Sequence, residues 1–146
     1  MIHASPPCQA YSTVSSNSKE YPDLYAAMRD RLEQLEKPWV IENVIGAPYR
    51  WGTTLCGSMF EMVVRRHRNF ETSWLILNPL RCDHTGPRPI TVTGKSGGVT
   101  EHSNKGIQSE WPLYMQMPWA TPQEVTQAIP PAYTFWIGQQ LLQHGA

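Results

Sequence analysis

The chain has 146 residues, a length typical of a single domain, and its formal net charge is zero. Six Trp, six Tyr and three Phe argue against an intrinsically disordered chain, because disordered chains combine high net charge with few aromatic residues. No apolar run approaches the roughly 20 residues needed to span a bilayer, and the first residues lack a signal-peptide pattern, so no membrane partner is expected. Three cysteines without a CxxC pair favour a reducing cytoplasm over a disulfide scaffold.

The first part of the chain predicts a strand, a helix and a second strand. Residues 1–5 resemble the end of a strand that runs into a proline-rich turn, and residues 22–36 predict a helix that a proline ends. The apolar residues of this helix recur at spacings of three and four: Leu24, Met28, Leu32 and Leu35. Residues 39–41 are an apolar run typical of a strand covered on both faces. Because strand, helix and strand in this order form a βαβ unit, the two strands are expected to be parallel.

The rest of the chain predicts a strand pair, a polar region and two helices. Two short strands with a turn are expected within residues 59–77, and residues 79–106 are polar and Gly-rich without a clear period. Thr121-Pro122-Gln123-Glu124 has the pattern of a capping box, which predicts the start of a short helix. A longer helix is expected over residues 131–143. The residues that this helix should bury are Tyr133, Trp136, Ile137 and Leu141.

Positive charge is concentrated in the middle of the chain. Between residues 62 and 105, seven basic residues stand against three acidic ones. Such a stretch is suited to binding a polyanion. The alternative interpretation is that these charges only form a solvated surface.

A thiol and a carboxylic acid follow the two predicted strands of the βαβ unit. Cys8 lies four residues past the first strand, and Glu42 ends the second. Since the carboxyl ends of parallel strands meet at one edge of a sheet, both side chains are expected to face one pocket. Cysteine is intrinsically nucleophilic, which makes covalent catalysis the functional interpretation. The alternatives are a buried, inert Cys8 and a Glu42 that only caps a loop or helix.

Two other kinds of site were considered, a cysteine-protease centre and a zinc site. A cysteine protease needs a histidine held close to the nucleophile, and the residues around the five histidines do not mark any of them as a catalytic base. A zinc site could be formed by Cys56, Cys82, His84 and His102, but these residues lack the paired spacing of common zinc motifs. From the spacing alone, no metal is expected.

Four segments of the chain resemble motifs of the DNA (cytosine-5) methyltransferase family, in the order in which that family has them. Ser5-Pro6-Pro7-Cys8-Gln9 resembles its catalytic loop, and Trp39-Val40-Ile41-Glu42-Asn43-Val44 resembles its Glu-Asn-Val motif, about thirty residues further on. Arg66-His67-Arg68 resembles the Gln-x-Arg-x-Arg motif, and Gln127-Ala128-Ile129-Pro130-Pro131 resembles the final Gly-Asn-Ala-Val-Pro segment. Among the members, the chain is most similar to the compact phage and prophage type.

The resemblance implies an α/β fold with part of a Rossmann-like (class I methyltransferase) sheet, a short target-recognition excursion and C-terminal helices. It divides the chain into a catalytic part (1–78), a small recognition region (79–118) and helices that return to the catalytic part (119–146). The family's Asp-Leu-Phe-x-Gly-x-Gly segment, which binds S-adenosylmethionine, does not precede His3. We therefore expect an incomplete cofactor site, and we expect the strand at residues 39–44 to lie on an exposed edge, where self-association or a separate cofactor-binding half would cover it.

The resemblance also implies roles for individual residues. The catalytic residues would be Cys8, Glu42, Arg66 and Arg68. DNA contacts would come from Pro7, Gln9, Asn43, Arg65, Lys95, Ser96 and Lys105. Contacts to S-adenosylmethionine would come from Pro6, Gln127, Ala128 and Ile129. The implied partner is double-stranded DNA in the cytoplasm of a bacterial or phage-infected cell, and the alternative function is a catalytically inactive DNA-binding remnant of such an enzyme.

Overall fold

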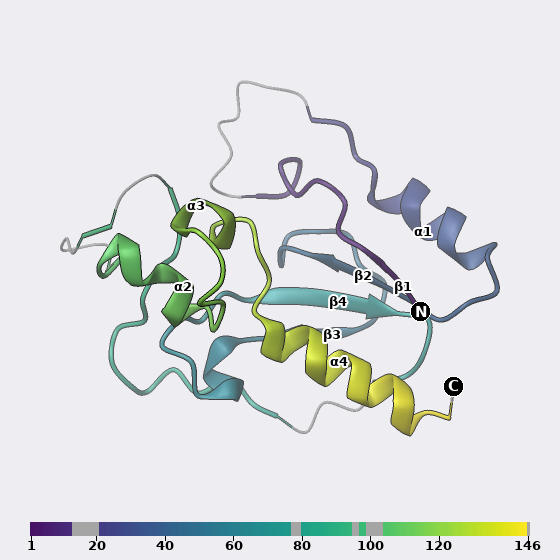
Figure 1. Ribbon diagram of the computed structural model, residues 1–146. Coiled ribbons are helices and arrows are strands. Elements are labelled where there is room, and N and C mark those ends of the chain that lie inside the picture. The colour runs from purple at the N-terminus through teal and green to yellow at the C-terminus, as the bar shows by residue number, and fades with distance from the viewer. Residues whose placement is uncertain (13–20, 77–79, 95–96, 99–103, 146) are drawn as a thin grey trace. The chain divides into compact units, whose positions relative to one another are not determined.

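The computed structural model describes residues 1–12, 21–76, 80–94, 97–98 and 104–145 (Figure 1). It is a mixed α/β fold with a four-stranded mixed sheet and C-terminal helices. The chain divides into two compact units. The first comprises Met1–Leu55, His67–Pro79 and His144–Ala146, and the second comprises Cys56–Arg66 and Leu80–Gln143. Within the described residues, no helix is both long and apolar enough to cross a membrane.

The sheet belongs to the first unit and has the strand order β1-β2-β4-β3 (Figure 1). Its strands are β1 (Ile2–Ala4), β2 (Trp39–Asn43), β3 (Thr53–Leu55) and β4 (Arg68–Thr72). The predicted parallel pairing of β1 and β2 is confirmed, whereas β4 runs antiparallel to both β2 and β3. The expectation of an exposed edge at β2 is wrong. All five residues of β2 are buried and the strand has a partner on each side, because β4 returns along the flank that was expected to be open.

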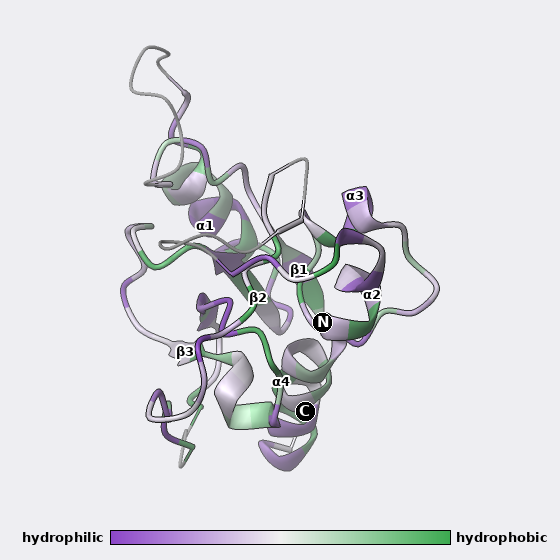
Figure 2. Cartoon of the chain, turned by 90° about the vertical axis from the view of Figure 1, so that its left-hand side faces the viewer, coloured by the Kyte–Doolittle hydropathy of each residue, from purple (hydrophilic) through white to green (hydrophobic). Residues whose placement is uncertain are grey.

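Helix α1 (Tyr25–Glu33) is shorter than the predicted helix over residues 22–36, and its buried face differs. The carboxylate of Asp23 accepts a hydrogen bond from the Tyr25 backbone N–H (3.0 Å), and the residues before Tyr25 are not helical. Leu24 is 41% exposed, while Tyr25 and Arg29 are buried with Leu32. The inward face is therefore shifted toward Tyr25 and Arg29, although Leu32 of the predicted stripe is buried, and much of α1 is hydrophilic (Figure 2).

An ion pair inside the first unit explains this shift. Arg29 Nε and Nη2 donate to the two carboxylate oxygens of Glu71 at 2.7 and 2.8 Å, and the Tyr25 hydroxyl donates to Glu71 Oε2 at 3.0 Å. Arg29 also donates to the backbone carbonyl of Pro48 (2.8 Å). Burial raises the pKa of Tyr25, and the Glu71 charge adds to the effect. These polar groups lie beside an apolar cluster formed by Tyr25, Leu32, Trp39, Ile41 and Ala47.

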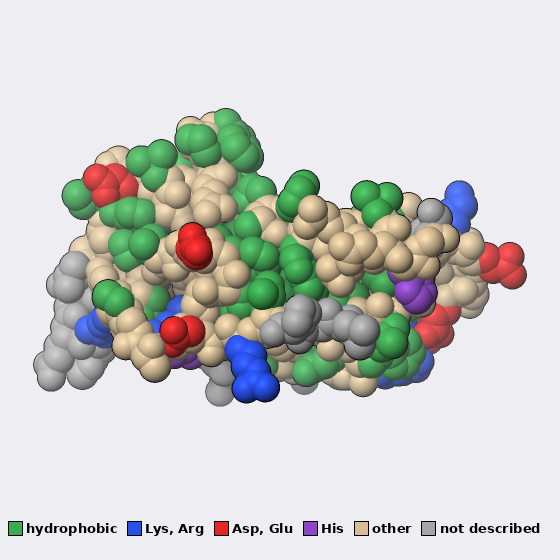
Figure 3. Space-filling view, turned by 90° about the horizontal axis from the view of Figure 1, so that it is seen from below, with side chains coloured by type: hydrophobic (Ala, Val, Ile, Leu, Met, Phe, Trp, Pro, Cys, Tyr) green, Lys and Arg blue, Asp and Glu red, His purple; other side chains and the backbone are tan. Residues whose placement is uncertain are grey.

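The second unit is built from short helices and loops. Its elements are η1 (Gly57–Phe60), η2 (Gln108–Glu110), α2 (Trp111–Tyr114), α3 (Pro122–Val125) and α4 (Pro131–Gln143). Its apolar cluster consists of Val64, Val92, Trp111, Met115 and Val125. In this unit the large apolar side chain of Phe135 is exposed. On the face of the molecule drawn in Figure 3, hydrophobic side chains also lie at the surface.

Both helices predicted near the C-terminus are confirmed. Thr121 and Glu124 form the predicted capping box, in which Glu124 N donates to Thr121 Oγ1 (3.3 Å) and Thr121 N donates to Glu124 Oε2 (2.7 Å). The long helix α4 has the predicted bounds. Of the residues predicted to be buried there, Tyr133 and Ile137 are fully buried, while Trp136 and Leu141 are partly buried.

Of the two strands predicted within residues 59–77, one is confirmed and the other is wrong. β4 lies in this range, but its hairpin partner β3 precedes it, and residues 57–60 form the single turn η1 instead. Gly57 explains the turn, because its N–H donates to the Arg65 carbonyl (2.6 Å) and an added Cβ would lie only 1.8 Å from the Val64 carbonyl oxygen. The backbone thus folds back on itself at a distance that only glycine permits.

Gly57→Ala is expected to lower the free energy of unfolding by roughly 1–3 kcal/mol, because the Val64 backbone must move to admit the methyl group. Chemical denaturation of both proteins measures the difference. Gly138→Ala in α4 is the matched control, since an added Cβ there meets nothing within 4 Å. The control should be neutral or more stable by up to about 1 kcal/mol. A Gly57→Ala protein as stable as the control would contradict the prediction.

The two observed units group the chain differently from the three predicted parts. Residues 56–66, expected in the catalytic part (1–78), belong to the second unit, and so does α4, expected to return to the catalytic part. The boundary expected between residues 78 and 79 lies next to the observed division at Pro79 and Leu80. How function is distributed among these parts stays a prediction.

Candidate functional site

The carboxyl ends of β1 and β2 lie together at one edge of the sheet. Ala4 is the register partner of Ile41, so the chain leaves β1 beside Glu42 and Asn43. The Asn43 side-chain amide donates to the backbone carbonyl of Pro6 at 2.9 Å, and Asn43 is 2% exposed. This buried hydrogen bond anchors the proline turn that carries Cys8 to the end of β2.

Glu42 and Arg68 form an ion pair at the same edge. Arg68 Nε lies 3.1 Å from Glu42 Oε1, and the two side chains are 21% and 7% exposed. Their proximity follows from the topology, because β4 is antiparallel to β2 and its first residue therefore lies at the carboxyl end of β2. A carboxylate and a guanidinium held in this way present both an acceptor and several donors to a planar polar ring.

Cys8 follows the anchored turn and is a free cysteine. As a residue it is partly exposed. Its backbone carbonyl accepts hydrogen bonds from the N–H groups of Tyr11 (3.0 Å) and Ser12 (2.9 Å), which form a tight turn directly after the cysteine. The predicted DNA-contact residues Pro7 and Gln9 flank Cys8 and are exposed. The turn therefore presents this segment at the surface of the first unit.

Sequence reasoning missed one buried polar residue at this edge. Asn69 is fully buried beside Arg68, and its amide group donates to the Ile45 carbonyl (3.3 Å) and accepts from the Thr54 hydroxyl (2.6 Å). It thus ties the loop after β2 to β3 and β4. Asn43 is similar, since its Oδ1 accepts from the Val44 N–H (2.9 Å), and its contacts are those of a positioning residue. The only available signal for Asn69 was an amide inside an otherwise strand-like segment.

Arg65 and Arg66 belong to the second unit, whereas Arg68 belongs to the first. Arg66 donates through its two terminal nitrogens to the carbonyls of Val92 (3.1 Å) and Thr126 (2.7 Å). It therefore joins three segments of the second unit through backbone contacts. Arg65 donates to the carbonyl of His84 (2.9 Å). A contact of either arginine with DNA or with a base stays a prediction.

The remaining predicted contacts are placed as follows. Lys105 is partly buried, and its carbonyl accepts from the Trp111 indole N–H (2.6 Å). Lys95 and Ser96 lie outside the described residues. The predicted cofactor residues Gln127, Ala128 and Ile129 follow α3 in the second unit, whereas Pro6 is buried in the first. Cofactor binding by these residues stays a prediction.

Comparison of the chain with protein-family models, with curated proteins and with solved structures finds no match. The functional interpretation therefore depends on the motifs and on the geometry of the sheet edge.

Proposed function

We propose that this chain carries the base-reacting centre of a DNA (cytosine-5) methyltransferase, on part of a class I methyltransferase sheet. The observation that carries the proposal is the Glu42–Arg68 ion pair, which lies at the strand ends next to the anchored Cys8 turn. A sulfur nucleophile, a carboxylate and a guanidinium at one sheet edge are the groups that an attack on cytosine requires. All three belong to the first unit.

Cytosine C5 is a poor nucleophile until a group adds to C6. In the proposed reaction the Cys8 thiolate forms a bond to C6, and the electron pair of the C5–C6 double bond moves to C5. Negative charge that spreads toward N3 and O2 is offset when Glu42 holds a proton on N3 and Arg68 donates to O2. The target base must leave the DNA stack to reach these groups, which costs a few kcal/mol.

S-adenosylmethionine would supply the methyl group that C5 receives in the complete reaction. The residues described here do not assemble a fitting site for it. Of the predicted cofactor contacts, only Pro6 lies in the first unit, where its carbonyl is occupied by Asn43. The pocket of the first unit that is lined by Trp39, Trp51 and Ser73 lies at the amino end of β2, away from Cys8. The part of the reaction attributed to this chain is thus the activation of cytosine.

Activation without a methyl donor has its own measurable product. After Cys8 adds to C6, C5 takes a proton from water. Removal of the original C5 hydrogen then restores the double bond and expels the thiolate. DNA labelled with tritium at cytosine C5 should therefore release tritium to water in the presence of this protein. No release despite intact DNA binding would favour the inactive DNA-binding remnant.

Glu42→Gln is expected to lower this tritium release by roughly 10²–10³-fold, because a neutral amide cannot hold the extra proton on N3 as charge builds up. The matched control is Glu33→Gln, whose carboxylate is 41% exposed on α1 and forms a surface ion pair with Arg50. The control should exchange tritium at the rate of the unchanged protein. Equal rates for the two variants would contradict the role of Glu42.

A further inference from the structure

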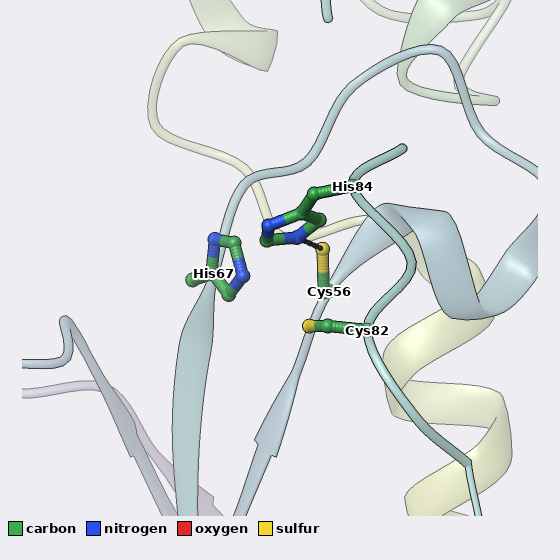
Figure 4. A group of neighbouring side chains, drawn as sticks. All are labelled: Cys56, His67, Cys82 and His84. Atoms are coloured by element: carbon green, nitrogen blue, oxygen red, sulfur yellow. Dashed lines mark hydrogen bonds between the residues drawn. The ribbon is translucent and has the colours of Figure 1, made fainter. Parts of the chain in front are cut away.

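Two cysteines and a histidine from separate segments of the second unit lie close together (Figure 4). Cys56 directly follows β3, and Cys82 and His84 lie in the segment after residue 80. The ligand atoms of these three side chains are all within 4.8 Å of one another. Cys56 Sγ and His84 Nε2 are 3.4 Å apart, as the dashed line in Figure 4 marks.

The separation of Cys56 and His84 matches the spacing of two ligands around zinc. With Zn–S bonds of about 2.3 Å and Zn–N bonds of about 2.0–2.1 Å, the ligand atoms of a tetrahedral site lie roughly 3.3–3.8 Å apart. The observed 3.4 Å between Cys56 and His84 falls in this range, and the 4.8 Å limit requires only a small closing movement. Two sulfurs and an imidazole nitrogen also form a donor set that selects zinc over hard cations such as Mg²⁺.

Hydrogen bonds connect the segments that carry the three ligands. The Ser58 hydroxyl donates to Cys56 Sγ (3.2 Å) and accepts from the Asp83 backbone N–H (3.2 Å). Arg65 holds the His84 carbonyl at 2.9 Å. The Gly57 N–H donates to the Arg65 carbonyl (2.6 Å). Such contacts around the ligands orient them, as the outer shells of metal sites do.

We propose that Cys56, Cys82 and His84 bind a zinc ion that joins residues 56–66 of the second unit to the segment that begins at Leu80. Three protein ligands leave one tetrahedral position, for which a water or one further side chain is needed. The site is separate from Cys8 and does not depend on the proposed methyltransferase activity.

Metal analysis of the purified protein tests the site. We expect about one zinc per chain. After zinc is replaced with Co²⁺, we expect the absorption of thiolate-to-cobalt charge transfer together with the strong visible bands of tetrahedral Co²⁺. Cys82→Ser and His84→Ala should each lower the affinity for Co²⁺ at least about 100-fold.

The controls are the cysteine and a histidine outside the cluster. Cys8→Ser and His144→Ala should retain about one zinc per chain, because both residues lie in the first unit. Cys82 and His84 are exposed, so their variants should keep the fold, which circular dichroism checks. The proposal is overturned if the unchanged protein binds neither metal, if the controls lose zinc as the variants do, or if mass spectrometry of the non-reduced protein finds a Cys56–Cys82 disulfide instead.

Discussion

Cys8→Ser is expected to abolish tritium release from cytosine C5, with a fall of at least roughly 10³-fold. A serine hydroxyl is not ionised near neutral pH, and addition to C6 requires an anionic nucleophile. The substitution replaces only the sulfur, and the hydrogen bonds that hold this turn use the backbone carbonyl of residue 8 and the side chain of Asn43. Folding and DNA affinity should therefore be unchanged, and the loss should be confined to chemistry.

The covalent step can be followed separately with 5-fluorocytosine DNA. In the presence of S-adenosylmethionine and a protein that completes the cofactor site, the unchanged chain should form a complex that survives denaturation, because fluorine at C5 cannot leave as a proton would. The Cys8→Ser protein should form none. Tritium release that persists in the Cys8→Ser protein, at unchanged melting temperature and DNA affinity, would eliminate Cys8 as the nucleophile.

Glu71→Gln is expected to lower the free energy of unfolding by about 3–5 kcal/mol, the largest stability effect predicted for this chain. Glu71 is completely buried and accepts hydrogen bonds from both Arg29 and Tyr25. A neutral amide leaves the Arg29 guanidinium buried without its counter-charge. The free energy needed to desolvate that charge is then uncompensated, which destabilises the folded state. Denaturant titration followed by tryptophan fluorescence measures the change.

The comparison variant is Glu33→Gln, which removes an ion pair of the same type from the surface. Glu33 and Arg50 are 3.3 Å apart, with side chains 41% and 50% exposed, so its loss should cost no more than about 1 kcal/mol. Replacing both buried partners, as Arg29→Met with Glu71→Leu, should recover much of the stability lost in Glu71→Gln. Similar losses in the buried and the surface variants would contradict the assigned importance of the buried pair.

Preferences of neighbouring residues were sufficient to predict several elements. The helix over Pro131–Gln143 and the capping box at Thr121 depend on neighbouring residues alone, and both were predicted with the correct positions. The apolar run at Trp39 likewise indicated a buried strand. The order of strand, helix and strand was enough to predict parallel β1 and β2, and with them that the proline turn after β1 reaches the carboxyl end of β2. That the Cys8 and Glu42 side chains face one pocket stays a prediction.

Other features required contacts between distant segments. The inward face of α1 was predicted from leucine spacing, but Arg29 lies inward because Glu71, 42 residues later in the chain, provides the charge that makes its burial possible. The ion pair of Glu42 with Arg68 likewise depends on β4 returning antiparallel to β2. No local pattern encodes such partners.

The amino-acid sequence by itself therefore determined the secondary structure near the C-terminus, the parallel strand pair and the position of the cysteine turn, since propensity, capping and periodicity act over a few residues. Only the tertiary structure decided which polar groups are buried, how β3 and β4 complete the sheet, and that Cys56 meets Cys82 and His84. These features depend on contacts between segments that are distant in the chain and come together only on folding, so no spacing between neighbouring residues predicts the partner of a buried charge or a thiol.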